Sequence, residues 1–75
     1  MSKLPVVSGR EIIRVLTKIG FEIVGRKGSH VRLKRRRNKE LLIVVVLMHR
    51  ELARGTLRSI LRQANMTLED LLRLL

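Results

Sequence analysis

The sequence has no cysteine, tryptophan or tyrosine, and Phe21 is its single aromatic residue. Without cysteine there is no disulfide framework and no thiolate metal site, which fits a reducing cytosol. A single aromatic residue cannot form the stacking platform that many proteins use to hold single-stranded nucleic acid. Any contact with nucleic acid must therefore depend mainly on charge.

Long apolar runs are also missing. The longest, Leu41–Met48, has eight residues, whereas about 20 are needed to cross a bilayer. Met1–Val7 contains no apolar region long enough for a signal peptide. We therefore expect a cytoplasmic protein that does not enter a membrane. The 75 residues suffice for one small domain over residues 1–75 and exclude two.

Acidic residues are few, since six Asp and Glu stand against 17 Lys and Arg, a formal net charge of +11. No acidic residue lies between Glu22 and Glu40, an interval that holds eight of the cations. A polyanion is the natural partner of such a block, and nucleic acid is the foremost candidate.

A first helix is predicted after Ser8–Glu11, which has the spacing of a capping box. Val7 and Ile12 stand where a hydrophobic staple requires apolar residues. Gly20 is a typical left-handed residue at the end of a helix. The apolar stripe of this helix is Ile12, Val15, Leu16 and Ile19.

Two further helices are predicted near the end of the sequence. Thr56 follows Gly55 and is a good N-cap for the second helix, whose apolar stripe runs to Ala64. Thr67–Asp70 resembles another capping box, which predicts a short C-terminal helix. Its apolar stripe would be Leu68, Leu71, Leu72 and Leu75. This last helix is expected to be either a lid on the core or a docking helix.

Three strands are predicted between the first two helices. Phe21–Arg26 and a run from about Ser29 to Arg35 would form an antiparallel hairpin, and Leu41–Met48 would be the third strand. Arg35–Lys39 is too polar and too like-charged to be buried, so it is expected to be a loop or a fraying hairpin tip. The predicted fold is therefore α+β: a helix, a three-stranded antiparallel sheet, a helix and a short C-terminal helix.

The third strand is apolar on both faces. Leu41, Ile43, Val45 and Leu47 would share one face, and Leu42, Val44, Val46 and Met48 the other. One explanation is that a partner protein covers the second face, in which case a charge at Val44 or Val46 would weaken the complex more than the fold. The alternative is a fully buried central strand.

Gly25–His30 is a glycine-bracketed turn within the basic block. The two glycines allow a tight turn and the close approach of a ligand. In the strand that follows, His30, Arg32 and Lys34 alternate with apolar residues, so they would share the solvent-facing side. This arrangement predicts a phosphate-binding surface with a proton-transfer group in it. The plain alternative is a basic hairpin turn with an incidental exposed histidine.

RNA cleavage suits these residues because the ribose 2′-hydroxyl is a built-in nucleophile. His30 is the candidate catalytic base that removes its proton. Lys27, Arg32 and Lys34 would stabilise the charge that develops on the phosphate, and Ser29 could position that phosphate. The candidate RNA-binding residues are Arg26, Lys27, Gly28, Ser29, Arg32, Lys34, Arg35, Arg36 and Arg37.

Three further residues are secondary candidates. Arg58 and Arg62 are four positions apart on the second helix and would extend the basic surface, although a solvated helix face is the more frequent explanation of such spacing. His49 could be a second acid or base, or could have a capping or structural role. No cofactor and no metal are expected, because two histidines nineteen positions apart and six scattered carboxylates form no recognisable ligand set.

Two motifs resemble those of a known family. Gly28-Ser29-His30 after a helix and a strand, together with the segment Gly55–Ala64, is similar to the HicA family of mRNA interferase toxins, and the similarity runs from Gly9 to about Thr67. The resemblance implies a fold similar to the double-stranded-RNA-binding domain, ribosome-independent endonucleolytic cleavage of mRNA and neutralisation by a cognate HicB antitoxin. The catalytic histidine of the family matches His30.

The sequence departs from the family in two places. Family members often have a proline before the second histidine, where this sequence has Leu47-Met48-His49. Glu69 and Asp70 belong to a C-terminal extension that many shorter members lack.

The leading hypothesis is a metal-independent mRNA endonuclease toxin, and the alternative is a non-catalytic RNA-binding module that uses the same surface. A DNA-binding regulator is disfavoured because the cations cluster on strands and no helix-turn-helix pair is evident.

Overall fold

Helix α1 (Gly9–Lys18) begins at the predicted capping box in the computed structural model, which describes residues 3–75. The backbone N–H of Glu11 donates to Oγ of Ser8 over 3.1 Å, and the N–H of Ser8 donates to Oε1 of Glu11 over 2.9 Å. Val7 and Ile12 are both buried in the core, as a hydrophobic staple requires. Gly20 has φ +101°, a conformation that glycine adopts without the strain of a side chain. The prediction for this helix is confirmed at both ends.

Helix α2 (Arg54–Gln63) begins earlier than predicted. Its N-cap is Ala53, which makes no side-chain hydrogen bond, so the expectation that Thr56 caps the helix is wrong. Tertiary contacts explain the difference: Leu52 is buried, and its N–H donates to the carbonyl of Val7 over 2.8 Å. This contact positions the chain so that the helix can start directly after it. The predicted stripe is confirmed, since Leu57, Ile60, Leu61 and Ala64 are all buried.

Helix α3 (Leu68–Leu74) also begins at its predicted capping box. The N–H of Asp70 donates to Oγ1 of Thr67 over 3.1 Å, and the N–H of Thr67 donates to Oδ2 of Asp70 over 3.0 Å. Its buried side differs from the predicted stripe. Leu71 is fully buried, and Leu68 and Leu74 pack against the core, whereas Leu72 and Leu75 are exposed.

The sheet consists of β1 (Glu22–Lys27), β2 (His30–Arg37) and β3 (Glu40–Leu47), antiparallel and in the order β1-β2-β3. Strand β2 continues past the predicted end, so the expectation of a loop over residues 35–39 is wrong for its first three residues. Cross-strand pairing outweighs the like charges there, because Arg35 and Arg36 pair with Leu42 and Leu41 of β3. The turn is reduced to Asn38 and Lys39, and Asn38 has φ +56°.

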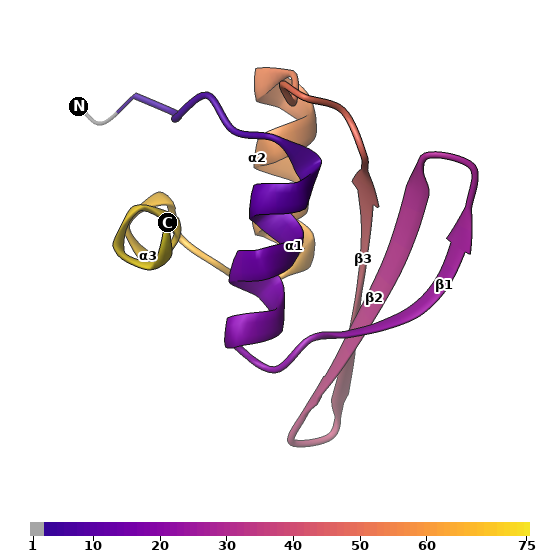
Figure 1. Ribbon diagram of the computed structural model, residues 1–75. Coiled ribbons are helices and arrows are strands. Elements are labelled where there is room, and N and C mark those ends of the chain that lie inside the picture. Colours follow the sequence, from indigo (N-terminus) through magenta and orange to yellow (C-terminus); the bar gives the residue numbers. More distant parts are fainter. Residues whose placement is uncertain (1–2) are drawn as a thin grey trace.

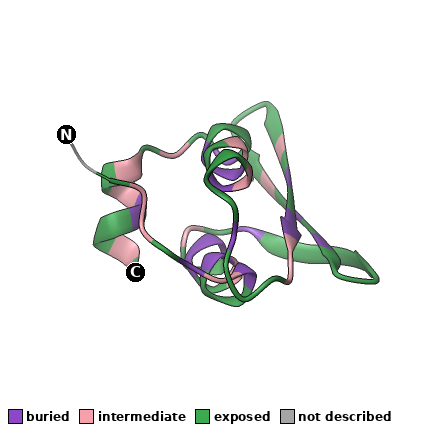
Figure 2. Ribbon diagram, turned by 90° about the horizontal axis from the view of Figure 1, so that it is seen from above, coloured by how far each residue is buried: buried purple, intermediate pink, exposed green. Residues whose placement is uncertain are grey.

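The elements are stacked in layers (Figure 1). Helices α1 and α2 lie side by side against one face of the sheet, which we call the inner face, and α3 lies on the far side of the helix pair from the sheet. Figure 2 shows buried positions on the helices and on the strand residues that face them. The opposite face of the sheet, the outer face, has no helix over it among residues 3–75. The α+β element order predicted from the sequence is confirmed.

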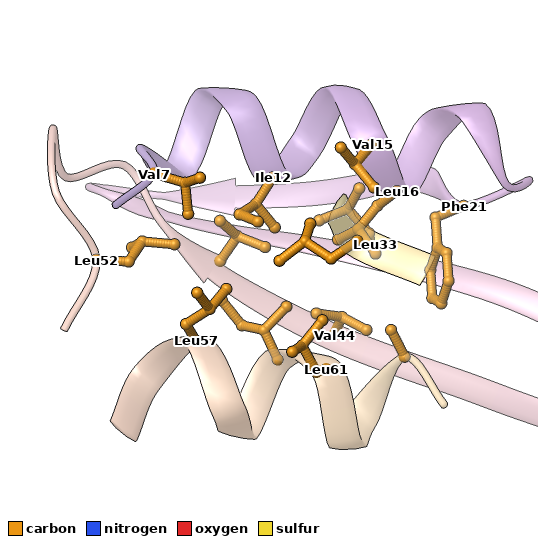
Figure 3. Close-up of a cluster of buried hydrophobic side chains, with 14 of the residues drawn as sticks. Val7, Ile12, Val15, Leu16, Phe21, Leu33, Val44, Leu52, Leu57 and Leu61 are labelled. Carbon is orange, nitrogen blue, oxygen red and sulfur yellow. The ribbon is translucent and has the colours of Figure 1, made fainter. Parts of the chain in front are cut away.

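The core lies between the inner face and the two helices (Figure 3). Side chains from α1, α2, β2 and β3 converge there, and Phe21 closes one end. Among residues 3–75 no polar or charged side chain is buried. The labelled members are Val7, Ile12, Val15, Leu16, Phe21, Leu33, Val44, Leu52, Leu57 and Leu61. A core of this kind supplies stability but no chemistry, so reactive groups have to be sought on the surface.

Strand β3 resolves the question raised by its two apolar faces. Val44 and Val46 lie on the inner face with none of their surface exposed, so these positions are not a surface for a partner. Leu41, Ile43 and Val45 lie on the outer face and are 49%, 42% and 37% exposed. Strand β3 is also an edge strand. The interpretation as a fully buried central strand is therefore wrong, and the exposed face is the one opposite Val44 and Val46.

Each helix described within residues 3–75 is too short or too polar to span a bilayer.

Candidate functional site

The turn between β1 and β2 places His30 on the surface. Gly28 and Ser29 form this turn, and Gly28 has φ +58°, as the first central residue of a tight hairpin often does. Lys27 and His30 face each other across it as a register pair. His30 is exposed and is the first residue of β2. A cation therefore stands directly beside the imidazole.

An irregularity in β1 decides which cation that is. The pairing with β2 shifts between Ile23 and Gly25, so Val24 is an extra residue of the bulge type. Strict alternation from Ile23 would place Arg26 on the outer face and Lys27 on the inner face. The extra residue reverses this, and Lys27 shares the outer face with His30. Bulges often change the direction of side chains near active sites in this way.

An open hollow of about 700 Å³ lies on the outer face at this point. It combines cations, an imidazole and two apolar side chains. Its lining consists of Val24, Gly25, Arg26, Lys27, His30, Arg32 and Val45. The hollow brings together residues from all three strands, including some that are far apart in the sequence, such as Val24 and Val45.

The outer face continues beyond the hollow as two parallel rows. Strand β2 supplies a row of basic side chains and β3 supplies an apolar row beside it, because directly paired residues lie on the same face. The pairs are His30 with Leu47, Arg32 with Val45, Lys34 with Ile43, and Arg36 with Leu41. Within residues 3–75 the single ion pair joins Arg73 to Asp70 on α3. The basic row therefore forms no ion pair with a carboxylate of residues 3–75, although Glu22 is the register partner of Lys34.

Arg35 and Arg37 lie apart from His30. Arg35 is half-buried on the inner face, where its guanidinium approaches Gly20, so the alternation of β2 separates it from the basic row. Arg37 is at the opposite end of β2 from His30, roughly 23 Å away for seven steps of extended strand. The structure brings Lys27, His30 and Arg32 together and leaves these two arginines elsewhere.

The secondary candidates also lie away from the hollow. Arg58 and Arg62 are exposed on α2, which covers the inner face, so they belong to a different surface. His49 is exposed after β3, and its carbonyl accepts a hydrogen bond of 2.9 Å from the N–H of Gly9. A Cβ on Gly9 would be 2.0 Å from the carbonyl oxygen of Leu47, so this approach of α1 to β3 requires glycine. His49 therefore has a backbone role in joining two elements.

Two members of the hollow are not evident from the sequence as site residues, namely Val24 and Val45. Apolar residues in strands are expected in a core. Here Val24 is exposed at the bulge, and Val45 is exposed because it lies on the outer face, which no described helix covers. The one sequence signal is Gly25, because a glycine inside a strand often marks a bulge or the close approach of a ligand. In the part of the chain that the structure describes, no three His, Asp or Glu side chains are grouped so as to hold a metal ion.

A comparison with curated proteins gave no match. The family model described as HicA toxin of bacterial toxin-antitoxin matches residues 9–66. The match starts at the first residue of α1, includes the sheet with His30 and α2, and ends before α3. The chain therefore belongs to the HicA family, the toxins of bacterial toxin–antitoxin systems.

Proposed function

We propose that this toxin is a metal-independent mRNA endonuclease with His30 as its catalytic base. The observation that carries the proposal is the position of His30, exposed in the hollow between Lys27 and Arg32. An imidazole that can reach a ribose hydroxyl, flanked by cations that can hold the adjacent phosphate, is what cleavage by the 2′-hydroxyl requires. Because the substrate is mRNA, the proposed site of action is the cytoplasm.

The reaction proceeds in one displacement at phosphorus. His30 takes the proton of the 2′-hydroxyl, the 2′-oxygen bonds to phosphorus, and the bond from phosphorus to the 5′-oxygen breaks. Arg32 stabilises the additional negative charge on the phosphoryl oxygens. Lys27, the register partner of His30 across the turn, would donate a hydrogen bond to the leaving 5′-oxygen. That oxygen takes a proton from water to become the 5′-hydroxyl, and His30 afterwards returns its proton to water. The products are a 2′,3′-cyclic phosphate and a 5′-hydroxyl end.

The test exchanges each of the two exposed histidines in turn. His30→Ala should abolish cleavage of a long RNA in excess EDTA, and the variant should keep its fold because the side chain lies outside the core. His49→Ala is the matched control and should cut like the wild type, since His49 does not line the hollow. Cleavage by His30→Ala at a rate near that of the wild type would refute the mechanism. Loss of wild-type cleavage in EDTA, restored by a divalent ion, would point to a metal site.

A non-catalytic RNA-binding module is the second candidate function. It is favoured by the basic row, which continues past His30 through Lys34 and Arg36. Such a surface could hold RNA by its phosphates alone. Full recovery of intact RNA after incubation with wild-type protein, together with binding that survives His30→Ala, would support this function over cleavage.

Membership of this family implies a cognate antitoxin, and we propose that it is of the HicB type and covers the outer face. Leu41, Ile43 and Val45 of the apolar row are exposed, and the neighbouring basic row forms no ion pair within residues 3–75. An acidic surface with apolar side chains would satisfy both. Coverage of the face is favoured over pairing with the edge of β3. Oε1 of Gln63 on α2 already accepts from the N–H of Val45 at that edge, over 3.4 Å. A partner in this position would exclude RNA from His30.

A further inference from the structure

Gly25 follows the bulge at Val24, which is a usual setting for a glycine in a strand, but the bulge does not by itself require glycine here. Gly25 lies inside β1, where a glycine weakens a strand because it loses more backbone entropy on folding and packs no side chain. Its φ is not among the positive values, which within residues 3–75 belong to Gly20, Gly28, Asn38 and Asn65. A Cβ built on Gly25 has no atom of the protein within 4 Å. Neither the backbone nor the packing of this chain therefore requires glycine at this position.

The side chain that Gly25 lacks would project toward the reactive groups. Gly25 is paired with Arg32 and lines the hollow together with Lys27 and His30. A larger residue would fill the floor of the hollow between them. The glycine thus keeps a space open at the one place where the proposed chemistry would need room for substrate.

The space has apolar sides as well as basic groups. Val24 on β1 is 45% exposed and Val45 on β3 is 37% exposed, and Val45 is the register partner of Arg32. The guanidinium plane of an arginine can stack on a nucleobase, and apolar side chains can contact the rest of its flat face. In a chain whose single aromatic residue, Phe21, is buried, these groups are the available substitute for an aromatic platform.

We propose that the hollow at Gly25 binds one unpaired nucleotide of the RNA. Its base lies over Gly25, against Arg32 and between Val24 and Val45, and its phosphate faces Lys27 and His30. The proposal rests on the proposed function and specifies its substrate: the base must be out of a duplex, so the toxin acts on single-stranded segments. Duplex RNA would present phosphates and 2′-hydroxyls to the basic row but no base to the hollow.

The test fills the space without disturbing the protein. Valine suits a strand, and a Cβ at position 25 has no protein atom within 4 Å, so the thermal stability of Gly25→Val should equal or exceed that of the wild type. Its affinity for a single-stranded 2′-O-methyl oligoribonucleotide, which cannot be cleaved, should fall by about tenfold or more, the loss expected for one base contact. Gly55→Ala is the matched control. Gly55 is likewise exposed with nothing within 4 Å, but it lies on α2, so its affinity should not change.

A probe with abasic sites provides the second arm of the test. The wild type should bind it about tenfold more weakly than the intact probe. Gly25→Val should bind the two probes with equal affinity, because its filled hollow contacts no base in either of them. If Gly25→Val does not fold, Gly25→Ala serves in its place with a smaller effect in the same direction. Unchanged affinity in a folded variant, or tighter binding of a duplex than of the single strand, would overturn the inference.

The same measurements separate this inference from the proposed function. If the wild type cuts RNA and Gly25→Val binds RNA with the same affinity, the proposed function stands and the proposed nucleotide site is wrong. If the wild type neither binds nor cuts RNA, both the proposed function and the proposed nucleotide site are wrong.

Discussion

The inner and outer faces of the sheet are built from alternate residues of the same strands, yet they differ in almost every property. On the inner face Val31, Leu33, Val44 and Val46 are at most 2% exposed and pack under α1 and α2. On the outer face the basic row of β2 runs beside the exposed apolar row of β3. Because successive side chains of a strand point to opposite faces, a register slip of one residue would exchange the two. Neighbouring residues of one strand therefore serve different purposes, one in the core that stabilises the fold and the next on the surface proposed to bind RNA.

The largest expected effect is the difference in stability between variants at two adjacent valines of β3, one on each face. Val44→Asp would place an unpaired carboxylate in the core, at a cost of about 3–5 kcal/mol, a large part of the about 5–15 kcal/mol that stabilises a small domain. Val45→Asp changes an exposed position beside Arg32 and should cost about 1 kcal/mol or less. Denaturant unfolding of the two isolated variants measures the difference. Equal destabilisation by both would show that the two faces are not distinct.

The same pair tests the proposed partner surface. Val45→Asp should fold and yet weaken the complex with the cognate antitoxin, because it places a carboxylate in the apolar row that an acidic partner would contact. Titration calorimetry with the purified antitoxin gives the affinity. Undiminished binding by a folded Val45→Asp would move the partner surface away from β3, toward the exposed helices.

Neighbouring arginines of β2 should show a smaller effect, on RNA binding. Arg36 belongs to the basic row on the outer face, and Arg35 is half-buried on the inner face. With four cations on the outer face, Lys27, Arg32, Lys34 and Arg36, the affinity for single-stranded RNA should fall with salt at a log–log slope of about −3. Arg36→Gln should make the slope shallower by about 0.7, and Arg35→Gln should leave it unchanged. Fluorescence anisotropy over a salt series provides both slopes, and a shallower slope for Arg35→Gln would contradict the assignment of faces.

Features governed by local sequence could be predicted, and features governed by pairing could not. Both capping boxes are contained in four residues each, so Ser8–Glu11 and Thr67–Asp70 identified their helices directly. The start of α2 depends on a hydrogen bond from Leu52 to Val7, which are far apart in sequence. The length of β2 likewise depends on its partner strand, since pairing with β3 keeps the like-charged arginines extended.

The candidate site divides in the same way. Alternation along β2 placed His30 and Arg32 on one exposed side from the sequence alone. The sequence also named Lys27 as a stabilising cation. That Lys27 and not Arg26 is the neighbour of His30 depends on the bulge at Val24, which only the register with β2 reveals. The exposed face of β3 was also undecidable, because both of its faces are apolar and alternation alone does not reveal which one the helices cover.

The smallest effect concerns α3, which packs behind the helices that cover the inner face and should matter to the fold but not to the outer face. Hydrogen bonds from the backbone N–H and the hydroxyl of Thr67 lower the pKa of Asp70 below its ordinary value of 3.8, and the guanidinium of Arg73 adds to this. Since the folded pKa is the lower one, the charged carboxylate stabilises the fold fully above pH 3.8, and this contribution is lost as the pH falls through the folded value. Asp70→Asn removes the titrating group, so its thermal midpoint should lie below that of the wild type near neutrality and approach it under acid. RNA affinity near neutral pH should be the same for both proteins. A gap in thermal midpoint that stays constant across this acid range would mean that the charge of Asp70 does not hold α3 in place.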